Sequence, residues 1–252
     1  MGQVTPDSPS EPTLERLLEH PAIWRGRSAA RTATLGTGCR RLDEALPGGG
    51  WPAAGLTEIL TARSGLGELR LLIPLLATLG RELPARWAAW ISPPFEPYAP
   101  ALIAAGVPLE RQLVVRTADP AWAIEQALDS GGCAIVLAWF ASTARSSGAA
   151  RSSGAARTNK STQLSALRRL QLATQRGQVP AFLFRPLDEA AQSSPAELRL
   201  VFEPSLEGGR LQLLKSRGGE RRPLDILWSE WREPNLRELK QGKPERDVHD
   251  QT

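Results

Sequence analysis

The stretch "TARSGLGEL", Thr61 to Leu69, decides how the fold is interpreted. It follows an apolar run, "GLTEIL", typical of a buried strand, and it precedes "RLLIPLLATLG", which has the composition of a helix. A strand, a glycine-containing turn and a helix are the setting of a phosphate-binding loop with the pattern G-x-x-x-x-G-K-[ST]. Here the diagnostic positions hold Ala62, Gly67, Glu68 and Leu69. The lysine and hydroxyl that hold a triphosphate and its Mg²⁺ are therefore missing.

Glu68 places a negative charge where a triphosphate would sit. Two like charges 4 Å apart repel by about 4 kcal/mol at an effective dielectric constant of about 20. The loss of the lysine adds a similar amount, so nucleotide affinity should fall by several decades. An alternative is that this turn never bound phosphate. In that case Glu68 simply complements the dipole of the helix that follows.

Alternating strands and helices extend outward from this turn. This alternation predicts an α/β fold with a mostly parallel sheet and helices on its faces. The stretches "LRLVFEP", "RLQLLKS" and "PLDILW" are spaced like consecutive antiparallel strands near the C-terminus. We expect strands at 55–60, 87–91, 112–116 and 133–138, and helices at 67–80, 97–105 and 120–129.

Composition divides the chain into three parts. Residues 1–36 hold a short N-terminal helix and a linker, 37–228 form the core, and 229–252 are a polar tail that we expect to be disordered. Within the core, residues 143–160 contain a six-residue unit twice in tandem, "RSSGAARSSGAARTNK". This composition is typical of a flexible, positively charged loop. Either it contacts DNA phosphates or it is an inert insertion; its basic residues are Arg145, Arg151, Arg157 and Lys160.

The remaining composition excludes several classes of protein. The net charge of +4 permits nucleic-acid contact without requiring it. The two cysteines lie far apart and form no metal or redox motif, and His20 and His249 are isolated. No apolar run reaches the roughly 20 residues of a membrane span, and the N-terminus lacks the features of a signal peptide. We therefore expect a cytoplasmic protein with no catalytic group, metal or cofactor.

The segment "TGCRRLDEALPGGGWPAAGLTEI" resembles the entry to the core of RecA-type recombinases. The resemblance covers residues 36–230 and implies a RecA-like fold. In that frame the catalytic glutamate maps to Pro94, and the Walker B aspartate maps to Ala138 and Trp139. Four catalytic groups are thus lost together. The resemblance implies a fold retained without ATPase chemistry.

The stretches "LLEHPAIWRGR", "LPGGGWP" and "PPFEPYAPAL" resemble the ImuA family of translesion-synthesis-associated proteins. This resemblance implies an accessory protein of damage-induced mutagenesis. Its partners would be an ImuB-like inactive relative of Y-family polymerases and an error-prone replicative-type polymerase. Contacts with RecA, with DNA and with a second copy of the chain stay open.

Three groups of residues are candidates for binding a protein partner. The N-terminal helix has an apolar face, a strand end carries two basic residues, and "LWSEWREPNLRELK" offers aromatic and leucine anchors. Each has a structural alternative: self-association, a solvated strand end, or packing against the core. The candidates are Leu14, Leu17, Leu18, Lys215, Arg217, Trp228, Trp231, Leu236 and Leu239.

Two other functions compete with this interpretation. A cell-division inhibitor of the SulA type also resembles a RecA core without Walker residues, and its partner would be a division GTPase. The third candidate is a DNA-dependent ATPase with an atypical site.

Overall fold

The computed structural model describes residues 33–81, 84–140, 153–216 and 222–231. The strands of this part are β1 (Thr34–Leu35), β2 (Trp51–Pro52), β3 (Leu56–Thr61), β4 (Trp87–Ile91), β5 (Gln112–Val115), β6 (Cys133–Trp139), β7 (Ala181–Pro186), β8 (Leu198–Pro204), β9 (Gly208–Lys215) and β10 (Leu224–Leu227). The α-helices are α2 (Arg40–Ala45), α3 (Ile73–Leu79), α4 (Ala99–Ala104), α5 (Pro120–Asp129) and α6 (Ser153–Gly177). Short 3₁₀ helices are η1 (Glu68–Leu71), η2 (Leu109–Arg111), η4 (Leu187–Glu189) and η5 (Trp228–Glu230).

Eight of these strands form one sheet, in the order β10-β9-β8-β3-β7-β6-β4-β5. The strands from β8 to β5 along this order are parallel to their neighbours, whereas β9 and β10 pair antiparallel. Because β3 lies inside the sheet and both of its faces are covered, all six of its residues are buried, polar Thr57 and charged Glu58 included. The predicted mixed α/β fold, with a mostly parallel sheet and antiparallel C-terminal strands, is confirmed.

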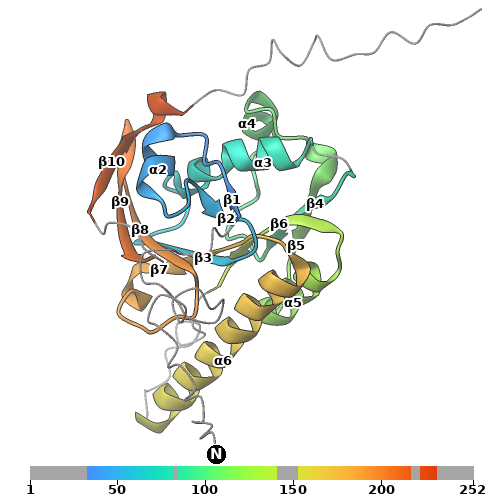
Figure 1. The fold of residues 1–252 in the computed structure, drawn as a ribbon. Coiled ribbons are helices and arrows are strands. Elements are labelled where there is room, and N and C mark those ends of the chain that lie inside the picture. Colours follow the sequence, from blue (N-terminus) through green and yellow to red (C-terminus); the bar gives the residue numbers. More distant parts are fainter. Residues whose placement is uncertain (1–32, 82–83, 141–152, 217–221, 232–252) are drawn as a thin grey trace, which may run out of the picture.

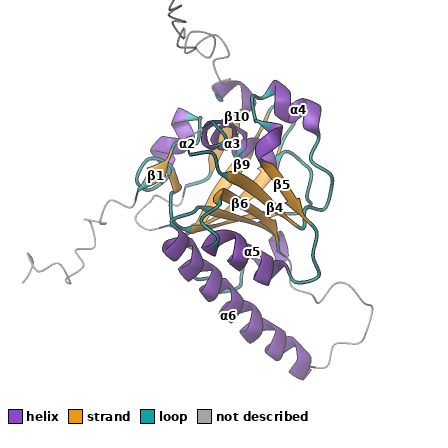
Figure 2. Cartoon of the chain, turned by 90° about the vertical axis from the view of Figure 1, so that its right-hand side faces the viewer, coloured by secondary structure: helices purple, strands orange, loops and turns teal. Residues whose placement is uncertain are grey.

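Helices cover both faces of the sheet (Figure 1). Helices α2, α3 and α4 lie on one face, and α5 and α6 pack together on the other, as the turned view also shows (Figure 2). Side chains that alternate along a strand therefore enter two separate cores. On β7, Phe182 belongs to the first core with Trp51 and Trp90, while Leu183 belongs to the second with Ile124.

The helix predicted at 67–80 is the main difference within the parallel half. The chain forms η1 first and begins α3 only at Ile73. Pro74 lies in the first turn of α3 and has no N–H to donate to a preceding carbonyl, so one continuous helix is ruled out. The predicted helix at 120–129 matches α5, whose first turn is capped by the Asp119 carboxylate accepting from the Trp122 N–H at 3.1 Å.

The predicted flexible loop at 143–160 is partly wrong. Helix α6 begins at Ser153, so Arg157 and Lys160 belong to a helix. Alanine and arginine favour helices, and the segment continues directly into an amphipathic stretch that packs on α5. Arg145 and Arg151 lie outside the described residues.

The ordered C-terminal part extends past the boundary expected at 228. Helix η5 follows β10, and the Glu230 carboxylate accepts a hydrogen bond from the Arg41 guanidinium at 2.7 Å. The core thus includes the start of the segment expected to be a tail. The N-terminal helix expected around Leu14, Leu17 and Leu18 lies outside the described residues.

Candidate functional site

The turn after β3, residues 62–67, is held by hydrogen bonds to the Glu68 carboxylate, and we call it the closed turn. Gly65 and Gly67 have φ angles of 86° and 105°, in the left-handed region that favours glycine. The Glu68 side chain is folded back beneath the turn, and the residue is only 2% exposed. Its two carboxylate oxygens accept from the Gly65 N–H at 2.6 Å and from the Leu66 N–H at 2.9 Å.

These two contacts give Glu68 a role that its sequence position did not predict. The backbone N–H groups of a phosphate-binding loop normally point toward a phosphate. Here two of them donate to a carboxylate of the same chain. Glu68 therefore does more than repel a nucleotide or complement a helix dipole, since it occupies the donors itself. A glutamate directly after "GLG" was the available signal.

The other positions at which the RecA resemblance would place catalytic groups hold apolar side chains or are exposed. Ala138 is fully buried on β6, and Trp139 stacks on Phe184 at 4.7 Å between ring centroids. Pro94 is exposed in the loop after β4. Leu69 packs against the first core, and Ala62 is exposed at the start of the turn. No carboxylate or hydroxyl stands at these positions, which leaves Mg²⁺ without ligands there.

Large apolar side chains are exposed beside the closed turn. Leu66 is 48% exposed, Phe95 63% and Tyr98 72%. The Phe95 ring lies over the turn, because a Cβ on Gly65 would come within 2.9 Å of it. We call Leu66, Phe95 and Tyr98 the loop patch. Single exposed apolar residues are ordinary on a protein surface, but Phe95 lies against the turn that carries Leu66, and Tyr98 follows three residues after Phe95, so we take the three as a candidate binding surface.

Basic side chains lie near the loop patch. Arg63 is exposed on the turn and makes no ion pair within the described part of the chain. The Arg116 guanidinium, 57% exposed, contacts Glu96 at 2.5 Å and donates to the Pro93 carbonyl at 3.2 Å. The surface therefore combines apolar area with the charge of Arg63, while the charge of Arg116 is paired with exposed Glu96. A partner that complements it would offer apolar side chains and carboxylates.

A second carboxylate is buried ten residues earlier, inside the sheet. Glu58 on β3 accepts from Arg185 on β7 at 2.9 Å and from Arg199 on β8 at 2.6 Å. The Ser194 hydroxyl donates to the same carboxylate at 2.6 Å, and Arg185 also pairs with Glu189. The two glutamates and two arginines balance in charge. This arrangement fits a structural role, because buried charges persist only when paired and hydrogen-bonded.

Lys215, predicted as a partner contact, lies beside this buried charge cluster. Its ammonium donates to the Ser194 carbonyl at 2.8 Å. The contact ties the end of β9 to the loop before β8 and departs from the expected solvated strand end. Arg217, the other member of the predicted basic pair, lies outside the described residues.

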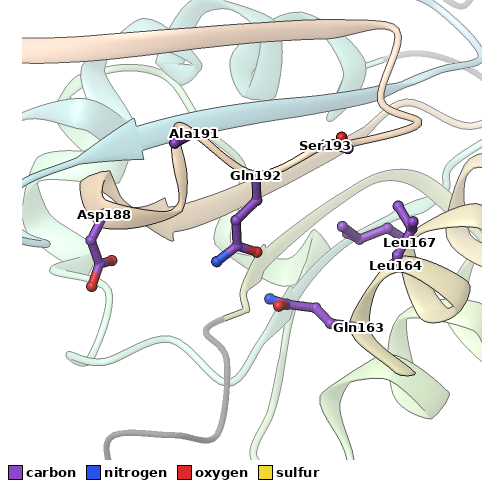
Figure 3. Close-up of a pocket in the computed structure, with 7 residues that line it drawn as sticks. All are labelled: Gln163, Leu164, Leu167, Asp188, Ala191, Gln192 and Ser193. Atoms are coloured by element: carbon purple, nitrogen blue, oxygen red, sulfur yellow. The ribbon is translucent and has the colours of Figure 1, made fainter. Parts of the chain in front are cut away.

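A pocket of about 420 Å³ opens between α6 and the loop that follows β7 (Figure 3). The amides of Gln163 and Gln192 point toward each other across it, and two leucines of α6 line one wall. The Gln163 amide donates to Glu189 at 3.3 Å, so the pocket adjoins the buried charge cluster. Its lining residues are Gln163, Leu164, Leu167, Asp188, Ala191, Gln192 and Ser193.

Trp228 and Trp231, predicted as exposed anchors, pack partly buried against the first core. Their ring centroids are 5.4 Å apart, and the Arg70 guanidinium lies 4.4 Å from the Trp228 ring centroid. Trp228 also lies against Gly67, since a Cβ there would come within 3.5 Å of the indole. The packing alternative therefore describes these residues. Leu236 and Leu239 lie outside the described residues.

The described residues offer no other obvious chemistry. Among them, no group of three or more His, Cys, Asp or Glu side chains could hold a metal ion. Cys39 and Cys133 are buried free thiols, and burial raises the pKa of both. Within the same part of the chain, no helix has the length and apolar character needed to cross a membrane.

Comparison with known proteins points to a family of division inhibitors. A family model described as "Cell division inhibitor SulA" matches residues 56–163. The cell division inhibitor SulA of Photorhabdus laumondii is 32% identical over 133 residues, which cover 52% of this chain and 63% of that protein. SulA of Edwardsiella piscicida is 40% identical over 72 residues, or 27% of this chain and 42% of that protein. The matched regions thus span less than two thirds of these relatives' own lengths.

These matches overturn the resemblance to the ImuA family. The predicted role as an accessory protein of translesion synthesis is wrong. The partners that it implied, an ImuB-like polymerase relative and an error-prone polymerase, are wrong with it. In the sequence, the resemblance to a RecA core without Walker residues fitted both the ImuA and the SulA interpretation. That resemblance therefore could not distinguish the ImuA family from the SulA family.

Proposed function

We propose that this protein is a SulA-like cell-division inhibitor that acts by binding and not by catalysis. The observation that carries the proposal is the position of the family match. It begins at β3 and ends within α6, and so contains both the closed turn and the loop patch. A RecA-like core, with the glycine turn at the end of its central strand, is part of the same proposal. Its place of action would be the cytoplasm.

The closed turn supports a function without nucleotide chemistry. The two N–H groups that could meet a phosphate already donate to Glu68. The side chains that would position Mg²⁺ and an attacking water are replaced at Pro94, Ala138 and Trp139. Neither cofactor nor metal is needed for the proposed activity. The surface beside the turn is free to serve recognition.

The loop patch is the surface that we assign to the partner. The partner would be the division GTPase, FtsZ, which the SulA relationship suggests. Leu66, Phe95 and Tyr98 would supply apolar contact, with aromatic rings of the kind that dominate interface energies. Arg63 and Arg116 would meet carboxylates on the partner. Binding should therefore weaken as salt concentration rises.

The test compares one exposed apolar site with another of similar exposure. Phe95→Ser removes a side chain from the loop patch, and Leu172→Ser removes a side chain that is 55% exposed on α6, across the sheet. Wild type and Leu172→Ser should bind purified division GTPase and slow its assembly, and expression should cause filamentous cells. Phe95→Ser should bind about 10-fold or more weakly, the effect expected of a hot-spot residue. The proposal is wrong if wild type leaves both GTPase assembly and cell length unchanged.

A further inference from the structure

The exposed turn has few internal contacts of its own. Residues 62–66 are all exposed, and they bear the Leu66 side chain and support the Phe95 ring. Within the described part of the chain, the two hydrogen bonds to the Glu68 carboxylate are the only ones these five residues make. A loop held by so few contacts has little to keep it in one conformation once they are lost.

The geometry points to Glu68 as a positioning residue for the loop patch, an inference that rests on the proposed function. Its carboxylate is an internal anion that fixes the turn and so presents Leu66 and Phe95 in one arrangement. Glu68 itself is buried and does not meet the partner. Its effect on binding therefore passes through the fraction of molecules whose turn is in the competent conformation.

The chemistry of the site explains why a glutamate is suited to it. Each carboxylate oxygen accepts from a different N–H group, at 2.6 Å and 2.9 Å. Glutamine has one acceptor oxygen, and its NH₂ group would face the second N–H as a donor against a donor. Alanine leaves both N–H groups without a partner and opens a space of the size of a small carboxylate. Added formate or acetate carries the same two oxygens and can enter that space.

The experiment uses Glu68→Ala, Glu68→Gln and the control Glu44→Ala, which removes an exposed glutamate of α2 that pairs with Arg40. Two measurements are made on the full chain: the amide chemical shifts of Gly65 and Leu66, and the affinity for the division GTPase. We expect both amide signals to move or broaden in Glu68→Ala. If one molecule in ten keeps the competent turn, affinity falls about 10-fold. Glu68→Gln should fall between wild type and Glu68→Ala.

Chemical rescue separates positioning from a general loss of structure. Formate at about 0.1 M should return the Glu68→Ala amide shifts toward their wild-type positions and recover affinity several-fold, whereas chloride at equal ionic strength should not. Glu44→Ala should match wild type throughout. If Glu68→Ala fails to fold, Glu68→Gln carries the same two readouts.

Two results would overturn the inference. One is unchanged Gly65 and Leu66 shifts in both Glu68 variants, which would show that the carboxylate does not set the turn. The other is altered shifts with full affinity, which would show that the turn does not matter to the partner. The amide shifts need no partner. A wild type that fails to bind the GTPase would therefore refute the proposed function and the presenting role, while the shifts alone still decide whether Glu68 holds the turn.

Discussion

Glu58 and Glu68 are two buried carboxylates ten residues apart, and they are satisfied in opposite ways. Glu58 lies inside the sheet and is paired with guanidinium groups of β7 and β8. Glu68 lies at the rim and accepts from backbone N–H groups two and three residues before it. The first carboxylate joins strands that are distant in sequence. The second fixes only the turn in which it stands.

Loss of either carboxylate should affect a different part of the fold. Removing Glu58 leaves Arg185 and Arg199 as buried cations without their shared partner, and uncompensated buried charge destabilises the whole fold. Removing Glu68 leaves two N–H groups at an exposed turn, where water can replace part of what is lost. We therefore expect a global effect from one glutamate and a local effect from the other.

The largest expected effect is that of Glu58→Ala. Breaking a buried ion pair by removing one partner costs about 3–5 kcal/mol, because the remaining charges stay buried. Urea unfolding should show a free energy of unfolding lowered by about this amount relative to the exposed control Glu44→Ala. A loss below about 1 kcal/mol would mean that the buried charge cluster does not hold the sheet together.

Glu68→Ala should destabilise the fold less. Two charge-assisted hydrogen bonds are lost, but the exposed turn relaxes, so we expect about 1–3 kcal/mol. The comparison is made in the same urea titration as Glu58→Ala. If Glu68→Ala lowers the free energy of unfolding more than Glu58→Ala does, then Glu58 does not stabilise the whole fold while Glu68 fixes only its turn, and the contrast is wrong.

Arg70→Ala tests whether a second contact at the rim helps to hold the turn. The Arg70 guanidinium lies over the Trp228 ring. The same Trp228 indole packs against Gly67 of the turn. A cation–π contact at an exposed site is worth about 0.5–1 kcal/mol. Thermal unfolding should show a small decrease in stability, with the Gly65 and Leu66 amide shifts unchanged. Shifts as large as those of Glu68→Ala would mean that Trp228 shares in fixing the turn.

The smallest expected effect is pH-dependent and belongs to Arg41 and Glu230. The hydrogen bond from Arg41 lowers the pKa of Glu230 below its ordinary value of 4.5. A lowered carboxyl pKa contributes stability that is present above the unfolded value and is lost as pH falls through the folded value. Arg41→Ala should thus be slightly less stable than wild type at neutral pH. The two should converge in acid, and a difference independent of pH would contradict the assignment.

Much of the sheet could be predicted from sequence, and the buried charges could not. Short apolar runs placed β3, β4 and β6 within about a residue of their observed bounds, because burial on both faces leaves a composition that is easy to recognise. Glu58 offered no such signal. Its partners Arg185 and Arg199 lie 127 and 141 residues away in sequence, and only the strand order brings them together.

The turn was half predicted. Its position after a buried strand followed from the glycines and from the apolar run before them. That the Glu68 carboxylate would fold back onto Gly65 and Leu66 depended on the positive φ angles of the two glycines, which sequence permits but does not specify. The role of Trp228 and Trp231, which follow β10, could not be predicted from the sequence. Composition alone does not separate a partner anchor from a side chain that covers the edge of a core.

The two cysteines give each layer of this molecule its own chemical reporter. Cys39 belongs to the core beneath α2 and α3, and Cys133 to the core beneath α5 and α6. Both thiols are buried, and their raised pKa keeps the reactive thiolate scarce at neutral pH. An alkylating reagent can therefore modify each one only when its layer opens. The ratio of the two modification rates would show which face of the sheet opens more often, and no cysteine would have to be introduced for the measurement.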